Sequence, residues 1–411
     1  MFKEYSYIVL RRIVRALAEW TIAKYQPGIV AITGSAGKTS TKLAAEIVLR
    51  HYRKVRASHG NFNNELGVPL AILGDWKKIE GKGFWLKVIF VSLFRLVFRM
   101  PYPEILILEY AVDRPGDMKY LVDMARPQIS VVTAIGDIPV HVEFFSGPEA
   151  LAREKAKIVE ALPAHGFAIL NYDDEAVFAM GDRTRAHAVT FGFNEGAAMQ
   201  ITNFEVQQKG DIPIGVAFKL NYGGNFVPVR LNGCFNKAQA YAAAAGACVG
   251  LLFGLNLVKI AEALAEYQPP SQRGQLVPGI KNAYIIDDSY NASPLSMRAA
   301  IETVHSLKAK RKIAVLGDML EIGIYTPEAH EAIGKMIPKC FDKLVTVGAR
   351  AKFIAEAATE AGMAKKNILS FDTADEAKLE VQKLIRQKDL ILVKASHSIG
   401  LDKIIEEIKH A

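Results

Sequence analysis

The chain has 411 residues, of which 50% are hydrophobic, and a formal net charge of +8. A chain of this length predicts two or three domains, each large enough to bury its own core. Its three cysteines, Cys234, Cys248 and Cys340, are too widely spaced for a paired zinc or redox motif, and the modest positive charge is no signature of nucleic-acid binding. We therefore expect a reduced, cytoplasmic protein that does not bind nucleic acid.

Residues 1–26 have the spacing of one amphipathic helix. Its apolar face would carry Val9, Ile13, Leu17 and Trp20, with Arg11, Arg12 and Arg15 largely elsewhere. The segment lacks the clean apolar stretch and small-residue cleavage site of a secretory signal. Packing on the domain that follows is the simpler interpretation of this helix, and membrane contact is the other.

The segment Ile29–Thr39 combines an apolar strand with a glycine-containing loop. It lacks the first glycine of the general phosphate-binding loop, where Ile32 stands, and fits the shorter form Thr-Gly-x-x-Gly-Lys-Thr. Backbone N–H groups of such a loop bind phosphate oxygens, Lys38 reaches the terminal phosphates, and the Thr39 hydroxyl can hold Mg²⁺. Because residues 40–49 have helix-forming composition, the phosphates would lie at a positive helix N-terminus. The segment therefore predicts a nucleoside triphosphate site.

Residues Phe84–Met100 form a second apolar segment, which is hydrophobic nearly all round. Lys87, Arg95 and Arg99 fall within one sector of roughly 120° at about 100° per residue. Three basic residues argue against a bilayer span. The pattern is typical of an interfacial helix, and equally of a helix docked on its own domain or on a partner protein. Both interpretations stay open.

A run of alternating strands and helices from Gly28 to about Asn171 is typical of a doubly wound, mainly parallel sheet. Strands are expected at 29–33, 105–109, 129–133 and 167–171. Short alternating segments at 186–232 predict antiparallel hairpins appended to this sheet, followed by helices at 236–252 and 256–266. The segment 268–274 contains prolines and small polar residues and is the best candidate for a linker.

Residues 271–411 predict a second α/β domain of dinucleotide-fold type. Its strands are expected at 283–287, 312–316, 342–347, 367–370 and 390–394, and its helices at 294–308, 327–336, 350–362, 373–386 and 398–409. It has neither a phosphate loop nor a Gly-x-Gly-x-x-Gly sequence. We therefore expect it to bring a substrate or to close over the nucleotide.

Polar residues that could carry chemistry follow several predicted strands. Glu109 ends the apolar run 105–108, at the edge where open α/β sheets bind ligands, and a carboxylate there suits Mg²⁺. His141 and Lys155 lie further along, and composition alone does not separate either from a structural or solvated residue. The segment Asp287–Pro294 has the character of a polar ligand loop that opens a helix.

Four segments occur in the order in which they are found in Mur ligases: Thr33–Thr41, Asn61–Pro69, Asp287–Pro294 and Leu316–Gly323. The chain resembles that family over residues 27–411, and the last three segments are most similar to its MurF branch. The resemblance implies a central ATP-binding domain at 27–270, with an insertion at roughly 76–103, and a C-terminal Mur ligase domain at 271–411. Residues 1–26 lie outside it.

The resemblance also implies roles for individual residues. Lys38, His141 and Lys155 would act in catalysis. Thr39, Glu109, His141 and Lys155 would hold two Mg²⁺ ions, with Lys155 carbamylated so that it becomes an anionic oxygen ligand. The ATP-contacting set would be Gly34, Ser35, Ala36, Gly37, Lys38, Thr39, Ser40, Asn236, Arg273, Asp288 and Asn291. The acceptor-peptide residues would be Asn61, Asn63 and Asn64.

The implied reaction forms an acyl phosphate on a peptidoglycan-precursor peptide, which D-alanyl-D-alanine then attacks. We expect a monomer for this activity, cytoplasmic or peripheral at the inner face of the membrane. Two other hypotheses stay open: a Mur-like ligase with a different acceptor or amine, and an ATP-binding regulatory protein descended from a ligase.

Three features depart from the family pattern. The phosphate loop begins only thirty-odd residues into the chain, where the family has an N-terminal UDP-binding domain, and the insertion carries the apolar segment 84–100. Phe235 and His397 stand where the family usually has His and Arg. The first two differences favour the hypothesis that the acceptor is held partly at a membrane or by a partner protein.

Overall fold

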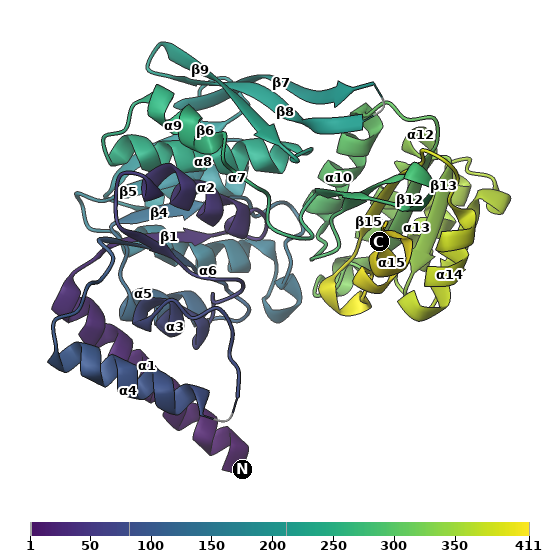
Figure 1. Cartoon of the computed structure of the whole chain (residues 1–411). Coiled ribbons are helices and arrows are strands. Elements are labelled where there is room, and N and C mark those ends of the chain that lie inside the picture. Colours follow the sequence, from purple (N-terminus) through teal and green to yellow (C-terminus); the bar gives the residue numbers. More distant parts are fainter. Residues whose placement is uncertain (1, 82, 211, 411) are drawn as a thin grey trace.

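The computed structural model describes residues 2–81, 83–210 and 212–410. The described residues form two α/β regions, each built on its own sheet, that lie side by side (Figure 1). The sequence-based expectation of a doubly wound α/β fold with appended hairpins is confirmed.

The first sheet has nine strands in the order β2-β3-β1-β4-β5-β6-β7-β8-β9. Its strands are β1 (Gly28–Thr33), β2 (Val55–Ala57), β3 (Ile105–Glu109), β4 (Ile129–Val132), β5 (Phe167–Asn171), β6 (His187–Gly192), β7 (Met199–Lys209), β8 (Ile212–Tyr222) and β9 (Asn225–Asn232). Pairing is parallel from β2 through to β7 and antiparallel across β7, β8 and β9. Strand β1 lies between β3 and β4, so the phosphate loop that follows it begins between the ends of these two strands.

One expectation for this sheet was wrong in detail. The segment 186–232 was expected to be antiparallel throughout, but β6 pairs in parallel with β5, from Phe167 opposite His187 to Asn171 opposite Phe191. The alternation of residues 187–192 fits a parallel or an antiparallel strand equally well, and only the crossover through α7 decides the direction.

Helices cover both faces of the first sheet. They are α1 (Phe2–Tyr25), α2 (Lys38–Arg50), α3 (Gly67–Leu73), α4 (Phe84–Val97), α5 (Asp117–Met124), α6 (Pro148–Glu160), α7 (Glu175–Phe178), α8 (Lys237–Leu252) and α9 (Leu257–Leu264). In β1, Val30 and Ile32 face the core built with α2, α8 and α9, whereas Ile29 and Ala31 face the core built with α1, α3, α5 and α6. A strand buried on both faces explains the continuous apolar run before the loop.

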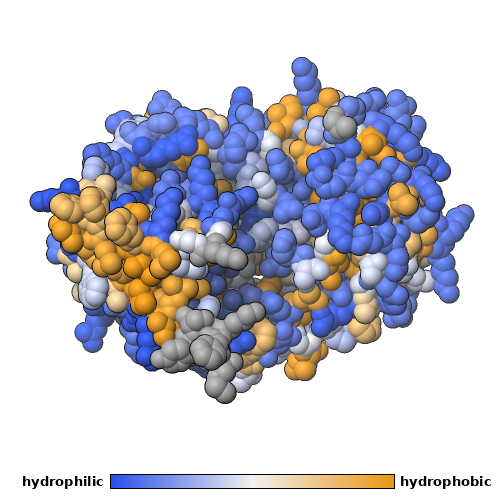
Figure 2. All heavy atoms as spheres, turned by 60° about the horizontal axis from the view of Figure 1, so that its bottom comes forward, coloured by the Kyte–Doolittle hydropathy of each residue, from blue (hydrophilic) through white to orange (hydrophobic). Residues whose placement is uncertain are grey.

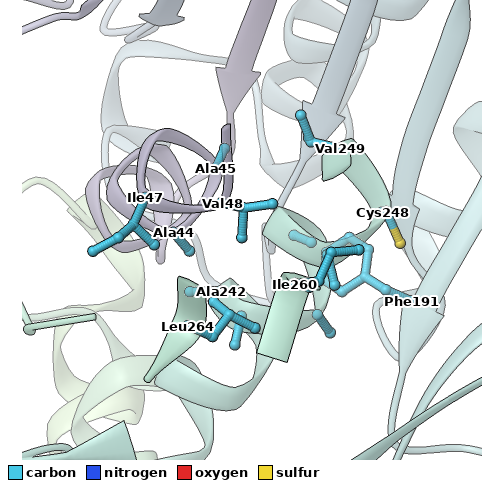
Figure 3. Close-up of a cluster of buried hydrophobic side chains, with 14 of the residues drawn as sticks. Ala44, Ala45, Ile47, Val48, Phe191, Ala242, Cys248, Val249, Ile260 and Leu264 are labelled. Carbon is cyan, nitrogen blue, oxygen red and sulfur yellow. The ribbon is translucent and has the colours of Figure 1, made fainter. Parts of the chain in front are cut away.

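Helix α8 packs unusually close to α2, the helix that follows the phosphate loop. Figure 3 shows Val48 of α2 turned toward the helices that carry Ala242 and Ile260. A Cβ atom at Gly246 would lie 2.9 Å from the backbone carbon of Ala44, so glycine is needed at this contact. The small residues of α8 thus fix the position of α2.

The second sheet has six strands in the order β10-β11-β15-β12-β13-β14, all parallel except β10. Its strands are β10 (Gln275–Pro278), β11 (Tyr284–Asp287), β12 (Lys312–Gly317), β13 (Lys343–Val347), β14 (Ile368–Phe371) and β15 (Leu390–Lys394). Its helices are α10 (Pro294–Ser306), α11 (Thr326–Gly334), α12 (Ile337–Cys340), α13 (Lys352–Glu360), α14 (Ala374–Leu384) and α15 (Asp402–Ile408). Helices again cover both faces. The β7–β8 hairpin reaches this half, where Gln208 exchanges side-chain hydrogen bonds of 3.1 and 2.9 Å with the backbone of Lys308.

Helices α1 and α4 lie against each other at one end of the molecule (Figure 1). Packing on the domain was the simpler of the two interpretations of α1, but most of the apolar face named for it is exposed: Val9, Ile13 and Trp20 face outward and only Leu17 is buried. The inward face is formed by Val14, Leu17, Ala18 and Thr21. The helix is apolar on two sides, so its periodicity does not say which side meets the sheet. In the part of the chain that the structure describes, no helix is long and apolar enough to cross a membrane.

Candidate active site

The phosphate loop lies between the end of β1 and the start of α2. Gly34 and Gly37 both have positive φ angles, 145° and 86°. A Cβ atom at Gly34 would lie 2.0 Å from the Thr133 hydroxyl oxygen, so no other residue fits there. The backbone N–H of Ser35 donates to the carbonyl of Ala134 at 2.6 Å, which pins the loop to the end of β4. The loop is therefore preformed, with the N-terminus of α2 behind it.

Lys38 and Thr39 open α2 and face the end of β3. The Lys38 ammonium donates to the Gly34 carbonyl at 2.9 Å, which curls the side chain back over the loop. The Thr39 hydroxyl donates to a Glu109 carboxylate oxygen at 3.0 Å. Ile32 of β1 pairs with Glu109 of β3, and this register brings Glu109 next to Lys38 and Thr39 at the start of α2.

Glu109 is buried at the centre of a small polar network. Its other carboxylate oxygen accepts a hydrogen bond of 3.0 Å from the Asn63 amide, and the Lys42 ammonium lies 3.4 Å from the carboxylate. Burial alone would raise the pKa of Glu109, but the ammonium groups of Lys42 and Lys38 hold that pKa below its ordinary value. Glu109 is therefore an anion in the folded protein.

Sequence reasoning missed Lys42, which is 1% exposed and also donates to the Gly60 carbonyl at 3.1 Å. The available signal was its position four residues after Lys38, because residues four apart lie on the same face of a helix.

His141 lies across the loop from Glu109. It has a positive φ of 71° and precedes a short 3₁₀ turn, Val142–Phe144. Its Nε2 lies 3.3 Å from an Asp113 carboxylate oxygen, and its Nδ1 lies 2.8 Å from one of Glu321. Burial, together with the ammonium groups of Lys38 and Lys155, nevertheless lowers the pKa of His141 to about 3. A neutral imidazole of this kind can ligate a metal ion.

Glu321 is the second residue that sequence reasoning missed, although it lies in the segment Leu316–Gly323. It comes from the second sheet's half of the chain and has a positive φ of 62°. A Cβ atom at the nearby Gly323 would lie 2.9 Å from the Cβ of Glu143, so the two halves touch closely beside His141. Glu321 thus connects the two halves at the site.

Lys155, on α6, lies beneath the loop. It is 1% exposed, and its ammonium donates to the Gly34 carbonyl at 3.2 Å. It forms no ion pair with any described residue. Burial, with Lys38 nearby, lowers the pKa of Lys155 to about 7. A large fraction of this amine is therefore uncharged near neutral pH.

The second half of the chain contributes cations and a carboxylate. The Arg273 guanidinium stacks over the Tyr290 ring, 4.1 Å from its centroid. The Lys394 ammonium, at the buried end of β15, lies 2.6 Å from the Asp288 carboxylate and donates to the Asn291 carbonyl at 2.9 Å. Burial raises the pKa of Asp288 in spite of this partner. Sequence reasoning missed Lys394. The only sequence signal for it is its place at the end of the apolar strand Leu390–Lys394.

A cavity of about 280 Å³ joins these groups across the two halves. Most of the residues expected to bind nucleotide, metal or acceptor line it: Ser35, Ala36, Gly37, Lys38, Thr39, Ser40, Asn61, Asn63, Glu109, His141, Asn236, Arg273, Asp288 and Asn291. Asp113, Gln239, Tyr290 and Lys394 also line it.

Three expected residues do not line this cavity. Gly34 shapes the loop from behind, and Lys155 contacts it from below. The Asn64 side chain instead accepts hydrogen bonds of 3.2 and 2.9 Å from the backbone N–H groups of Leu66 and Gly67, at the start of α3.

The cavity has the composition of a site for a polyphosphate and a cation. Loop N–H groups, Lys38, Arg273 and Lys394 provide positive charge, and the Thr39 hydroxyl and Glu109 carboxylate provide oxygen ligands. Among the described residues no cluster of three or more His, Cys, Asp or Glu side chains suits a metal ion.

Comparison with known proteins gives two family matches. The model of the Mur ligase middle domain matches residues 91–247, and that of the Mur ligase glutamate ligase domain matches residues 272–397. The UDP-N-acetylmuramoyl-tripeptide--D-alanyl-D-alanine ligase of Mycobacterium leprae is 30% identical, in a match that covers 92% of this chain and 72% of that protein.

Solved structures of MurF share the fold. MurF from Acinetobacter baumannii matches with a TM-score of 0.81 and 24% identity, covering 97% of this chain and 80% of that one. MurF ligase from Thermotoga maritima, in complex with ADP, matches with a TM-score of 0.79 and 24% identity, covering 97% and 83%.

Proposed function

The chain belongs to the Mur ligase family, and we propose that it joins D-alanyl-D-alanine to a peptide carboxylate of a peptidoglycan precursor. As a member of that family it is an ATP-dependent ligase that forms a carbon–nitrogen bond. The proposal for its two substrates rests on the relative from Mycobacterium leprae, whose name gives a UDP-N-acetylmuramoyl tripeptide and D-alanyl-D-alanine.

The observation that carries the proposal is the cavity shared by the two halves. One wall holds the phosphate loop with Glu109, and the opposite wall holds Arg273 and Asp288. A ligase of this type must hold a nucleotide, a carboxylate and an amine together and keep water from an activated acyl group. A site divided between two halves does this when they close on the substrates.

The proposed reaction has two steps. A carboxylate oxygen of the precursor attacks the γ-phosphorus of ATP, and the bond from that phosphorus to the β–γ bridging oxygen breaks, giving ADP and an acyl phosphate. The amine of D-alanyl-D-alanine then attacks the acyl carbon to form a tetrahedral intermediate. Collapse expels inorganic phosphate, and the nitrogen loses a proton as the amide forms.

The position of each residue in the cavity indicates which part of the substrates it would bind. The loop N–H groups and the Lys38 ammonium bind the phosphates and stabilise charge that develops on the transferring group. Asn236 and Arg273 would hold the nucleoside end, with Asp288 and Asn291 on the far wall. Asn61 and Asn63 lie near Glu109, where they would orient the acceptor carboxylate, and Asn64 would act by shaping their loop.

We further propose that two Mg²⁺ ions take part, one held by Thr39 and Glu109 and the other by His141 and a carbamylated Lys155. The residues fit this role, because the Thr39 and Glu109 oxygens converge and Lys155 is a buried, partly uncharged amine that can react with CO₂. Bound Mg²⁺ would offset the negative charge of the phosphates. We expect the protein to work as a monomer in the cytoplasm, including at the inner face of the membrane.

Phosphate release from ATP tests the proposal when it is measured with the UDP-linked tripeptide precursor and D-alanyl-D-alanine, together and singly. We expect release only with both substrates, and a product whose mass is that of the joined peptide. Lys38→Ala should abolish release, whereas Lys365→Ala, at an exposed surface lysine, should not change it. Release with another amine alone would contradict the proposed substrates. ATP binding without release under any pairing would instead favour a regulatory protein.

A further inference from the structure

Helix α4 turns a wide apolar face away from the protein. Its inward side is formed by Phe84, Val88 and Ser92, spaced four residues apart. The opposite side carries Leu86, Phe90 and Val97, which are 72%, 71% and 75% exposed, with Leu93 and Phe94 between them. A monomeric soluble protein rarely leaves a continuous apolar helix face in water.

Helix α1 adds to this surface. Val9 and Ile13 are partly exposed on its outer side, and Trp20 is 57% exposed. Figure 2 shows apolar side chains gathered at the end of the molecule where α1 and α4 pack together. We name the α1–α4 face by its members: Val9, Ile13, Trp20, Leu86, Phe90, Leu93, Phe94 and Val97.

Polar contacts fix the two helices to each other before anything binds. The Lys24 ammonium of α1 donates to the carbonyls of Arg95, Leu96 and Phe98 at 2.9, 2.9 and 3.2 Å, which caps the C-terminus of α4. The Tyr25 ring stacks on Tyr102 with centroids 4.5 Å apart. The α1–α4 face is therefore a preformed platform, so binding there does not have to order it.

On the α4 side of the α1–α4 face the charges are positive, and on the α1 side Glu19 is paired with Arg15 at 2.7 Å. Arg12, Lys87 and Arg99 are exposed, and none of the three forms an ion pair with a described residue. No Asp or Glu occurs between Gly83 and Pro103. Apolar side chains bordered by unpaired cations complement a surface whose interior is hydrocarbon and whose outer layer carries phosphate.

We propose that the α1–α4 face binds the surface of a bilayer that contains anionic lipid. The helices would lie in the interface, because α4 has only 14 residues and no described helix can span a bilayer. The apolar side chains would enter the acyl boundary while Arg12, Lys87 and Arg99 contact the headgroup phosphates. This inference does not depend on the substrates of the ligase.

Helix α1 of this face also contacts the segment that follows the acceptor loop, Asn61–Asn64. The Tyr7 hydroxyl of α1 donates to a Glu65 carboxylate oxygen at 2.8 Å, directly after the Asn61–Asn64 loop. Helix α1 also packs on α3, which begins where that loop ends. A bilayer bound to the α1–α4 face would therefore contact α1, the same helix that supports the acceptor loop.

Vesicle co-sedimentation of the full chain tests the proposal. We expect binding to phosphatidylcholine vesicles that contain phosphatidylglycerol, and much weaker binding to phosphatidylcholine alone. Val97→Glu should reduce binding at least about tenfold, because it places a charge in the apolar face. Val258→Glu is the matched control, since Val258 is 59% exposed on α9 and should leave binding unchanged. Lys87→Ser and Arg99→Ser should each cost roughly fivefold, and added salt should have the same effect.

Two results would overturn the proposal. One is equal binding of the wild-type chain and Val97→Glu to the anionic vesicles. The other is a concentration-dependent dimer in light scattering that Val97→Glu abolishes while no vesicle binding occurs, which would assign the face to a second copy of the chain. Circular dichroism and ATP binding of Val97→Glu, expected to match the wild type, exclude misfolding as the cause of lost binding.

Discussion

At the residue scale, buried lysines dominate the site. Lys42 pairs with Glu109 and Lys394 with Asp288, so each of these two ammonium groups has a carboxylate within reach. Lys155 is the exception, because its ammonium contacts only the Gly34 carbonyl among the described residues. A buried ammonium without a counter-ion destabilises the folded state whenever it is charged. The position of Lys155 therefore does not stabilise the fold, and it is better explained by the reactivity of a buried amine.

This difference gives a pH-dependent prediction for Lys155→Met. The pKa of Lys155 falls from 10.5 to about 7 on folding, so between these values the unfolded chain binds more protons than the folded chain. The cost of burying Lys155 is then greatest below pH 7 and disappears as the pH rises toward 10.5. In buffer free of CO₂, Lys155→Met should raise the free energy of unfolding by at least about 1 kcal/mol below pH 7, with a gain that shrinks above it.

Urea unfolding at a series of pH values on both sides of 7 measures this gain. The exposed Lys365→Met serves as the control and should show no such dependence. A gain for Lys155→Met that stayed constant with pH would mean that the ammonium is not perturbed by burial. The same variant should lose ligation, so stability and activity would change in opposite directions.

At the element scale, the contact between α2 and α8 holds the phosphate loop in place. The loop itself is short and local, but its helix is positioned by small residues that follow much later in the sequence, in α8. Gly246 meets the backbone of Ala44 and Ala45, and Gly250 meets Val48. Tight backbone contact leaves no space that a larger side chain could use.

Gly246→Val should therefore move α2 away from α8. We expect a loss of about 1–3 kcal/mol in the free energy of unfolding, as for other overpacked cores, together with weaker ATP binding because the loop moves with α2. Thermal unfolding and ATP titration measure the two effects. Ala361→Val, at an exposed helix end, should change neither. Unchanged ATP affinity in Gly246→Val would show that the loop is positioned independently of α8.

At the scale of the whole molecule, the site exists only where the two halves meet. Glu321 approaches His141, and the β7–β8 hairpin joins the second half through Gln208. Arg273 lies near the end of the predicted linker, 268–274, and lines the same cavity as the loop. ATP bound in this cavity would therefore contact both halves at once.

Arg273→Ala should weaken ATP binding by roughly 10- to 100-fold, because a charge-assisted contact from the second half is lost. The unfolding temperature without nucleotide should change little, since Arg273 has no ion pair among the described residues. Isothermal titration with ATP measures the affinity, and Arg350→Ala, at an exposed arginine, is the control. Equal affinities for both variants would mean that the second half does not hold the nucleotide.

The sequence by itself determined the order of the elements, the two α/β regions and the phosphate loop. These depend on short-range patterns: continuous apolar runs of a few residues, glycines at positions that need positive φ, and a lysine and threonine directly after them. Most expected site residues line one cavity because the carboxyl ends of parallel strands meet at one edge.

Only the tertiary structure decided which distant residues meet and which helix faces stay in water. Lys42, Lys394 and Glu321 lack a local motif, because their partners lie far away in the chain and a pairing over such a distance leaves no periodic signal. The outward side of α1 was misjudged for a related reason. A helix with apolar residues on two sides satisfies the same periodicity in either orientation, and packing against α3 and α4 alone selects the buried side.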